Sequence, residues 1–328
     1  MKKSVFLAFL LSFSVFAREW ETIYIPDANC GDGIPYKVFF KPGKKSKLAI
    51  ELMGGGACWG FTSCWGPILN TWIHPIPSLP AFSYLTTETS PIQDHTFIYF
   101  PYCTGDVYAG NHVAKYIPLK NTYHQGGRNI GLTLDHLKAI KKIDFKKPES
   151  LVLYGSSAGG IGALLHRKKF ESYMRPGIKK LLIADSVGLH YAKDFWKKFT
   201  PELLIDFTAA FAPVGIKVDK NEGMVAPQFK RYCQLAGDWN IGFIQTTEDI
   251  IMSKMFGGLT QEQHRKAVLG PKGIGNVLKD SANCTTHISE GQGHMLLILP
   301  DVARDSLDID TGESAMDYVD RLITESEI

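Results

Sequence analysis

The strongest chemical signal in the sequence is the run GSSAGG at residues 155–160, which fits the pattern G-x-S-x-G with Ser157 at its centre. The run directly follows the apolar stretch LVLY and precedes a helical pattern. In such a strand-to-helix turn, small neighbours let the strand and the helix approach closely, and the serine is exposed as a nucleophile. The helix N-terminus then points N–H groups at the place where an oxyanion would form. Ser157 is therefore predicted to carry out acyl transfer, although the run alone is equally compatible with a flexible turn.

A second glycine-rich segment, MGGGACW at residues 53–59, directly follows the apolar run LAIEL. Acyl transfer needs backbone N–H donors for the oxyanion, and a loop after an early strand can supply them. We predict Gly55 and Gly56 as donors, beside the N–H group of Ala158. A phosphate-binding loop is the other use of such a segment, but neither a following Lys-Ser/Thr nor G-x-G-x-x-G spacing is present.

A nucleophilic serine needs a histidine as its base. We predict His294, which lies in the small-residue turn GQGHM, where a loop could present an imidazole. His287, in CTTHIS, is the alternative and could equally be a strand residue. His166 falls on the helix after Ser157, and the charged run QEQHRK around His264 predicts a solvent-facing helix.

The acid that orients the base is predicted to be Asp249, which comes late in the chain, shortly after the apolar run IGFIQ. Asp185 ends another apolar run, LLIA, and is the rival candidate, while Glu248 is adjacent to Asp249. Each aspartate could instead cap a helix.

The elements that must position these residues alternate between short apolar runs and helical patterns. Strands are predicted at 48–52, 96–100, 151–154, 181–184 and 241–245, and helices at 130–140 and after Gly159. This alternation predicts an α/β fold with a mostly parallel central sheet that helices cover on both faces. Such sheets bind ligands at the carboxyl ends of their strands. The stretch 190–239 shows two helix-like segments, around 195–199 and 202–211, without a strand pattern, so it forms either a cap over the site or crossover helices.

Length and charge favour one exported globular domain. The chain has 328 residues, of which 45% are hydrophobic, and a formal charge of +3 that gives no reason to expect a nucleic acid as partner. Lys2, Lys3 and the apolar run at 5–16 predict a signal peptide at 1–17, cleaved after Ala17, because a membrane span needs about 20 apolar residues. We expect residues 18–328 to form a single secreted or periplasmic domain without an integral membrane segment.

Six cysteines lie in the part that would be exported: Cys30, Cys58, Cys64, Cys103, Cys233 and Cys284. An even number in an oxidising compartment predicts three disulfides. The sequence lacks both C-x-x-C and H-E-x-x-H, so we expect neither a metal ion nor a cofactor.

Six motifs in this order resemble those of the pectin acetylesterase and Notum carboxylesterase family. They are CGDG at 30–33, GGGAC at 54–58 with a further cysteine six residues on, YCTGD at 102–106, GGRNI at 126–130, GSSAGG at 155–160 and ADS at 184–186. The resemblance implies an α/β-hydrolase fold with the site residues named above: Ser157 as nucleophile, Asp249 as acid, a late histidine, best matched by His294, and Gly55, Gly56 and Ala158 as oxyanion donors.

The resemblance also implies the pairs Cys58–Cys64 and Cys30–Cys103, which leaves Cys233 and Cys284 for each other. Three positions depart from the family's motifs, because Ala57 replaces a Trp, Thr104 replaces an Asp and Val187 replaces a Gly. These departures imply that the acyl pocket or its rim is reshaped.

We therefore expect an exported serine carboxylesterase that hydrolyses O-acyl esters through a Ser-His-Asp triad and an acyl-enzyme. An O-acetyl ester on a polysaccharide is the leading substrate. A lipid or polyester esterase with the same triad is the alternative, which the aromatic residues Trp59, Phe61, Trp65 and Trp72 could favour. A non-catalytic carbohydrate-binding relative and a metallohydrolase are the remaining hypotheses.

Overall fold

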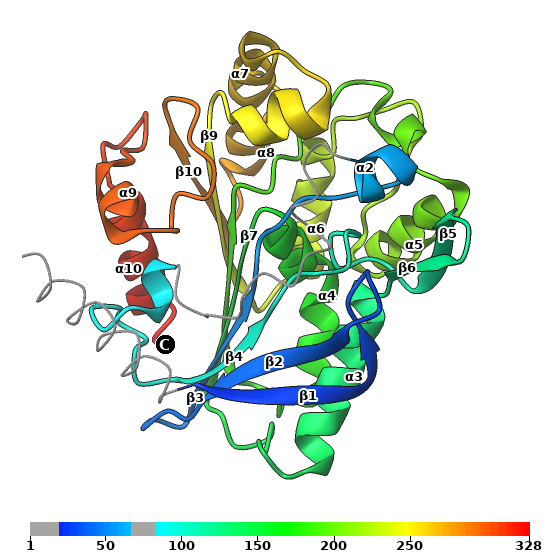
Figure 1. Cartoon of the computed structure of the whole chain (residues 1–328). Helices are drawn as coiled ribbons and strands as arrows, with labels where there is room; N and C mark the ends of the chain where they lie inside the picture. The colour runs from blue at the N-terminus through cyan, green and yellow to red at the C-terminus, as the bar shows by residue number, and fades with distance from the viewer. Residues whose placement is uncertain (1–19, 67–82) are drawn as a thin grey trace, which may run out of the picture.

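A mixed eight-stranded sheet forms the centre of the computed structural model, which describes residues 20–66 and 83–328 (Figure 1). The strand order is β1-β2-β4-β3-β7-β8-β9-β10. The strands of this sheet are β1 (Glu21–Asn29), β2 (Pro35–Lys41), β3 (Lys47–Leu52), β4 (Thr96–Phe100), β7 (Ser150–Ser156), β8 (Lys179–Asp185), β9 (Asn240–Thr246) and β10 (Cys284–Ser289). A separate hairpin consists of β5 (His112–Ile117) and β6 (Lys120–His124). The predicted signal peptide and Trp72 lie outside the described residues.

The sheet is parallel from β4 to β10, whereas β1 and β2 are added antiparallel at one edge. The five strands predicted from apolar runs correspond to β3, β4, β7, β8 and β9. The prediction of a mostly parallel sheet is therefore confirmed. The carboxyl ends of the parallel strands lie along one edge, from which the turns after β3, β7, β9 and β10 leave the sheet.

Helices cover both faces of the sheet, as predicted. The α-helices are α2 (Phe61–Trp65), α3 (Gly126–Ala139), α4 (Ala158–Tyr173), α5 (Pro201–Phe211), α6 (Phe229–Leu235), α7 (Gln261–Leu269), α8 (Ile274–Leu278), α9 (Pro300–Asp305) and α10 (Ala315–Glu325). Shorter helical turns are η1 (Tyr84–Thr86), η2 (Phe195–Lys198), η3 (Ala212–Val214), η4 (Ala226–Gln228) and the π-helix η5 (Ile251–Gly257).

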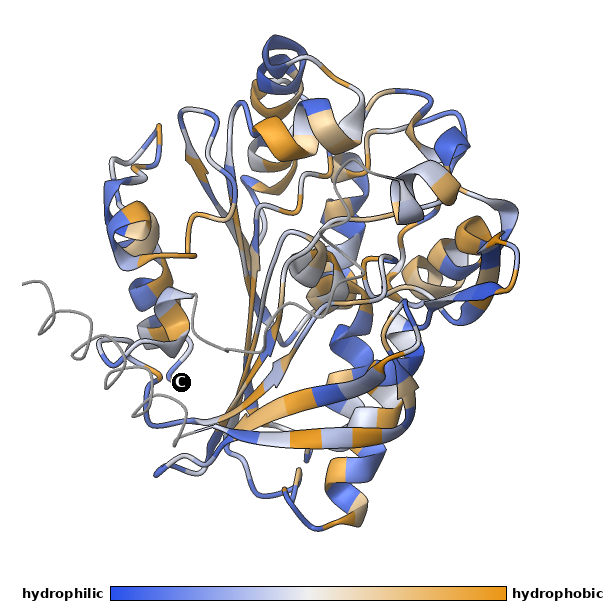
Figure 2. Cartoon of the chain, in the orientation of Figure 1, coloured by the Kyte–Doolittle hydropathy of each residue, from blue (hydrophilic) through white to orange (hydrophobic). Residues whose placement is uncertain are grey.

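Two apolar layers result from the period-two alternation of side chains along the strands. In β7, Leu151 and Leu153 face the layer that contains α3 and α4, while Val152 and Tyr154 face the layer that contains α9 and α10. Figure 1 shows these two helix groups on opposite sides of the sheet. Figure 2 shows the alternation most plainly along the edge strand β1, which is apolar on one face only.

One polar side chain interrupts the second layer. Glu51 of β3 is only 7% exposed, lies between Tyr99 of β4 and Tyr154 of β7 in the sheet, and accepts a hydrogen bond of 3.1 Å from the hydroxyl of Ser83. Burial raises the pKa of the Glu51 carboxyl to about 8, and the Ser83 hydrogen bond opposes this only in part. Glu51 is therefore protonated in the folded protein at neutral pH but ionised in the unfolded chain.

Replacing Glu51 with glutamine is expected to stabilise the protein increasingly as the pH rises from about 5 to 8. Unfolding of the natural protein releases a proton from Glu51 over this range, so its free energy of unfolding falls with pH, whereas glutamine has no proton to release. The difference in free energy of unfolding between Glu51→Gln and the natural protein should grow by at least about 1 kcal/mol over this pH range, because one unit of pKa shift corresponds to about 1.4 kcal/mol. Urea unfolding at both pH values measures it, and parallel pH profiles would contradict it.

Three disulfides tie the periphery to the sheet, and they are the pairs that the resemblance implied. Cys30–Cys103 joins the turn after β1 to the loop after β4, Cys58–Cys64 closes the loop that leads into α2, and Cys233–Cys284 joins α6 to β10. Disulfides of this kind are typical of proteins that fold in oxidising compartments.

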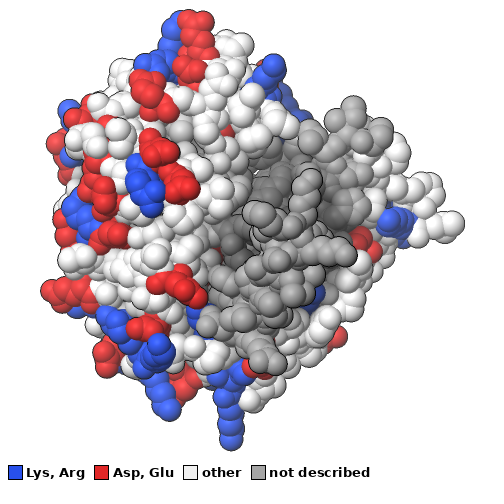
Figure 3. Space-filling view, turned by 60° about the vertical axis from the view of Figure 1, so that its left-hand side comes forward, with Lys and Arg blue, Asp and Glu red and all other residues white. Residues whose placement is uncertain are grey.

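Within the described ranges, none of the helices has the length and apolar character needed to cross a membrane. Figure 3 shows the side of the molecule that carries α9 and α10, where acidic and basic side chains are interspersed rather than gathered by sign. Ion pairs of this region include Arg304–Asp301 and Arg321–Glu313, each at 2.8 Å.

The stretch 190–239 is helical, with η2 and α5 close to the two helix-like segments predicted there. Its side chains Phe195, Phe199 and Phe207 are buried in the same apolar layer as α4. That the stretch acts as a cap stays a prediction.

Candidate active site

Ser157 lies in a tight turn between β7 and α4. Its backbone has φ 54° and ψ −124°, a left-handed conformation that non-glycine residues rarely adopt. The turn is possible because glycines lie two positions before and two positions after Ser157: a Cβ atom on Gly159 would lie 2.0 Å from the carbonyl oxygen of Leu52, and one on Gly155 would lie 2.2 Å from that of Gly159. The helix α4 begins at Ala158, so its N-terminus starts directly at the serine.

His294 and Asp249 are joined by a hydrogen bond of 2.7 Å between the imidazole Nδ1 and the carboxylate Oδ2. An ionised carboxylate only accepts, so Nδ1 carries the proton and Nε2 is left as an acceptor. Asp249 is 1% exposed, and its other oxygen, Oδ1, accepts the N–H groups of Ile251 and Met252 at 2.9 Å each. These two bonds fix the carboxylate at the start of η5 and aim Oδ2 at the imidazole.

Asp185 holds the chain that follows His294. Its carboxylate accepts the N–H groups of Leu296 and Leu297, at 3.1 and 2.9 Å, and the hydroxyl of Ser186 at 2.8 Å. Burial raises the pKa of the Asp185 carboxyl, and these donors counteract the rise in part. Both oxygens are thus occupied by the loop, so Asp185 positions the histidine segment, whereas the carboxylate that contacts the ring belongs to Asp249.

The other predicted histidines lie elsewhere. His287 is a buried strand residue of β10 whose Nε2 contacts the Ser289 hydroxyl at 2.9 Å and the Ser306 carbonyl at 3.1 Å. His166 bonds the carbonyl of Tyr108 at 2.6 Å from its place on α4. The expectation that His264 is solvent-facing is wrong: it is fully buried on α7, with Nδ1 2.9 Å from the Thr247 carbonyl, because the charged residues around it occupy the other face of the helix.

Gly55, Gly56 and Ala158 border the same cavity as Ser157. No acceptor in the described part of the chain takes their backbone N–H groups. The loop that carries the two glycines lies against the ring of Tyr102, because a Cβ atom on Gly55 would be 2.0 Å from that ring. The three N–H groups therefore lack an acceptor among the described residues and belong to residues that line the cavity of Ser157.

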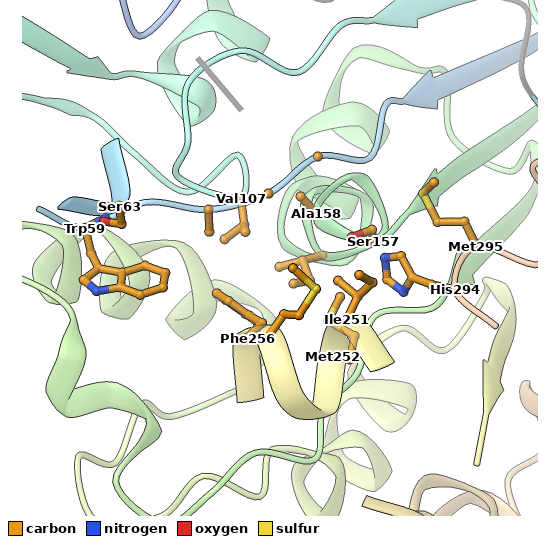
Figure 4. A pocket seen from close by; sticks show the side chains of 15 residues that line it. Trp59, Ser63, Val107, Ser157, Ala158, Ile251, Met252, Phe256, His294 and Met295 are labelled. Atoms are coloured by element: carbon orange, nitrogen blue, oxygen red, sulfur yellow. The ribbon is translucent and has the colours of Figure 1, made fainter. Parts of the chain in front are cut away.

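The cavity has a volume of about 420 Å³ and is lined mainly by apolar side chains. Figure 4 shows Ser157 and His294 next to each other at one end and Trp59 at the other, with Phe256 between them. The π-helix η5 supplies Met252, Met255 and Phe256, none of which the sequence patterns singled out. Ala57, which stands where the family motif has a tryptophan, also lines the cavity.

One group of possible metal ligands lies close together in the described part of the chain, namely Cys58, Cys64 and His124. The two sulfur atoms are bonded to each other. The two ring nitrogens of His124 contact the Thr104 carbonyl and the Tyr116 hydroxyl at 2.9 and 3.1 Å. Every atom of this group that could bind a metal is thus already in a disulfide or a hydrogen bond.

The parallel sheet, the strained serine between strand and helix, and a late histidine paired with an aspartate define the class of the α/β-hydrolase fold. Two crystal forms of the Wnt deacylase Notum from Drosophila match this fold, each with a TM-score of 0.64, 14% identity and 94% of both chains covered. A sequence model described as pectinacetylesterase matches residues 21–197, more than half of the chain. The chain belongs to the pectinacetylesterase family.

Two curated relatives are palmitoleoyl-protein carboxylesterases. NOTUM of Schmidtea mediterranea is 31% identical over 88 residues, which are 27% of this chain and 16% of the relative. Notum1' of Xenopus laevis is 25% identical over 236 residues, 68% of this chain and 47% of the relative. The matches thus span less than half the length of either relative.

Proposed function

We propose that this protein is a serine carboxylesterase in which Ser157 is the nucleophile, His294 the base and Asp249 the orienting acid. The observation that carries the proposal is the 2.7 Å bond from Asp249 to the imidazole of His294, beside Ser157 in one cavity. Nε2 of His294 takes the hydroxyl proton, and Oγ of Ser157 attacks the ester carbonyl. The proton then passes to the leaving alcohol, which leaves an acyl group on Ser157. A water molecule, deprotonated by His294, attacks this acyl-enzyme and releases the acid.

The N–H groups of Gly55, Gly56 and Ala158 are the proposed donors to the oxyanion. Charge develops on the carbonyl oxygen in both steps, and fixed backbone donors in a largely apolar cavity stabilise it without reorganisation. The N-terminus of α4 adds its positive dipole at the same place.

For the substrate, the cavity favours an apolar acyl group longer than acetyl. Its volume of about 420 Å³ falls in the range of roughly 300–1,000 Å³ that is common for pockets holding drug-sized ligands. Ala57 leaves room that a tryptophan would fill. The names of the curated relatives, which are palmitoleoyl-protein carboxylesterases, support the same choice. An O-acetyl ester of a polysaccharide, the leading expectation from sequence, would occupy a small part of this space.

We further propose export, to the periplasm or outside the cell, with cleavage after Ala17. The three disulfides support an oxidising compartment. We also propose that residues 18–328 act as one catalytic domain, with 190–239 as its cap.

A chain-length series of p-nitrophenyl esters, from acetate to decanoate, tests this proposal beside acetylated pectin and xylan. We expect kcat/KM to rise beyond acetate and turnover to survive EDTA. Release of acetate from a polysaccharide with higher kcat/KM than any longer ester would support the acetylesterase instead, and loss of turnover in EDTA would contradict a serine mechanism.

A further inference from the structure

Lys198 occupies an unusual environment at the end of η2. Its Nζ atom lies over four aromatic rings, at 4.1 Å from the ring centres of Phe195 and Phe256, 4.6 Å from that of Trp59 and 5.3 Å from that of Phe199. It also donates a hydrogen bond to the backbone carbonyl of Phe256. No carboxylate of the described residues pairs with it. An ammonium held by rings and one carbonyl joins three separate chain segments: the loop at 54–60, η2 and η5.

These rings belong to the walls of two neighbouring cavities. Trp59 lines the active-site cavity, Phe195 and Phe199 line a smaller one of about 20 Å³ behind it, and Phe256 lines both. Val107 and Ile161 complete the shared wall. The smaller cavity has room for little more than one water-sized group, but apolar and aromatic residues alone line it, so it would extend the apolar space at the end of an acyl chain if the shared wall moved.

We propose that Lys198 sets the length of acyl chain that the active-site cavity accepts, by holding Phe256 and Trp59 as the wall that closes its far end. This inference rests on the proposed esterase function. Cation–π contacts with buried rings such as those of Phe195 and Phe199 are favourable. The bond to the Phe256 carbonyl secures the last turn of η5, which ends at Gly257. Without the ammonium, Phe256 can turn away and the two cavities become continuous.

The charge of Lys198 depends on pH within the working range. Burial lowers the pKa of its ammonium to about 7, and no neighbouring charge contributes to this shift. The charged residues on its own and the adjoining helices are exposed, namely Asp194 and Lys197, which pair with each other, Glu202 of α5 and Lys254 of η5, except for the partly buried Asp206 of α5, which pairs with His112. The loop at 54–60 has no charged residue. The wall should therefore loosen as the pH rises through about 7.

The test compares kcat/KM for p-nitrophenyl decanoate with that for the butanoate, in the natural protein and in Lys198→Met. Methionine is similarly long and unbranched but has neither the charge nor the donor. We expect the ratio of kcat/KM for the decanoate to kcat/KM for the butanoate to rise by about tenfold in this variant. A change of this size matches the energy range of cation–π contacts that are shielded from water. Lys198→Arg keeps a charge and donors and should retain the natural ratio. Lys197→Met is the matched control on the exposed side of η2.

The pH profile of the same ratio separates a positioning role from a general loss of stability. Titration of the triad affects both esters equally and cancels, so the ratio should rise across about pH 7 in the natural protein and stay flat in Lys198→Met and Lys198→Arg. An unchanged ratio in Lys198→Met, or an equal rise in Lys197→Met, would overturn the inference.

Binding gives a readout that does not depend on catalysis. In a Ser157→Ala background, calorimetry should show decanoate binding about tenfold tighter with Lys198→Met than without it. Equal affinities would overturn the role of Lys198. If the natural protein hydrolysed no ester, the proposed function would fail, and this comparison would still decide whether Lys198 closes the cavity.

Discussion

Replacing Ser157 with alanine is expected to lower kcat/KM for a p-nitrophenyl ester by at least about ten-thousand-fold, because the covalent route then has no nucleophile. The small residual rate should come from the oxyanion donors and substrate binding alone. Little change in fold is expected, because the backbone N–H of Ser157, which donates to the Asp185 carbonyl at 2.7 Å, is kept when the side chain becomes alanine. Stopped-time assays at matched protein concentration measure the loss, with circular dichroism to confirm folding.

Ser172→Ala is the matched control. This serine lies at the far end of the same helix, α4, and its hydroxyl donates only to the Lys169 carbonyl one turn earlier, at 2.7 Å. Its kcat/KM should stay within about twofold of the natural value, as is usual for a surface substitution. Activity in Ser157→Ala within tenfold of the natural protein would show that another residue is the nucleophile.

The second large effect is expected for Asp249→Asn, with a loss of about a thousandfold to ten-thousandfold in kcat. The amide oxygen can still accept the N–H groups of Ile251 and Met252, so η5 should begin as before. The amide nitrogen, however, would face Nδ1 of His294 as a donor and favour the tautomer in which Nε2 carries the proton. The imidazole could then no longer accept the proton of Ser157.

Asp185→Asn provides the contrast, because this carboxylate binds the backbone after His294 rather than its ring. An amide at this position satisfies fewer of the three donors, so the free energy of unfolding should fall by about 1–3 kcal/mol. We expect a smaller loss of kcat than for Asp249→Asn, together with a lower Tm. Near-natural activity in Asp249→Asn combined with inactivity in a folded Asp185→Asn would assign the acid to Asp185.

The strands of the parallel sheet could be predicted because burial on both faces produces uninterrupted apolar runs, such as LVLY before Ser157. β1 carries buried side chains on one face only, and β10 contains polar residues such as Thr285, Thr286 and His287, so neither forms such a run. The edge strands β1 and β10 therefore cannot be predicted from apolar runs.

The turn around Ser157 could be predicted because each glycine there satisfies a local steric requirement. The partners of His294 depend instead on packing between distant segments: Asp185 ends one strand and Asp249 lies in the turn after another, and only the three-dimensional path of 293–297 decides which carboxylate meets the ring and which meets the backbone. Sequence reasoning could place both aspartates at the same edge of the sheet, but it could not orient them.

The pocket walls were the least accessible to prediction. Met252, Met255 and Phe256 reach the cavity because η5 is a π-helix, whose wider turn does not follow the 3.6-residue apolar period of an α-helix. The burial of His264 is hard to predict because the buried face of α7 consists of His264 and Val268 only, among charged and polar neighbours.

Covalent labelling with a fluorophosphonate ester is the sharpest test of Ser157 as the nucleophile, because the reagent phosphonylates a serine only where a base activates it and an oxyanion site stabilises the product. Intact mass and peptide mapping of the natural protein, Ser157→Ala and Asp249→Asn should be compared after equal exposure. We expect one adduct per chain, located on Ser157, with esterase activity lost in proportion, no adduct in Ser157→Ala and slow labelling in Asp249→Asn. An adduct on another residue that abolishes activity, or full turnover after Ser157 is completely modified, would contradict it.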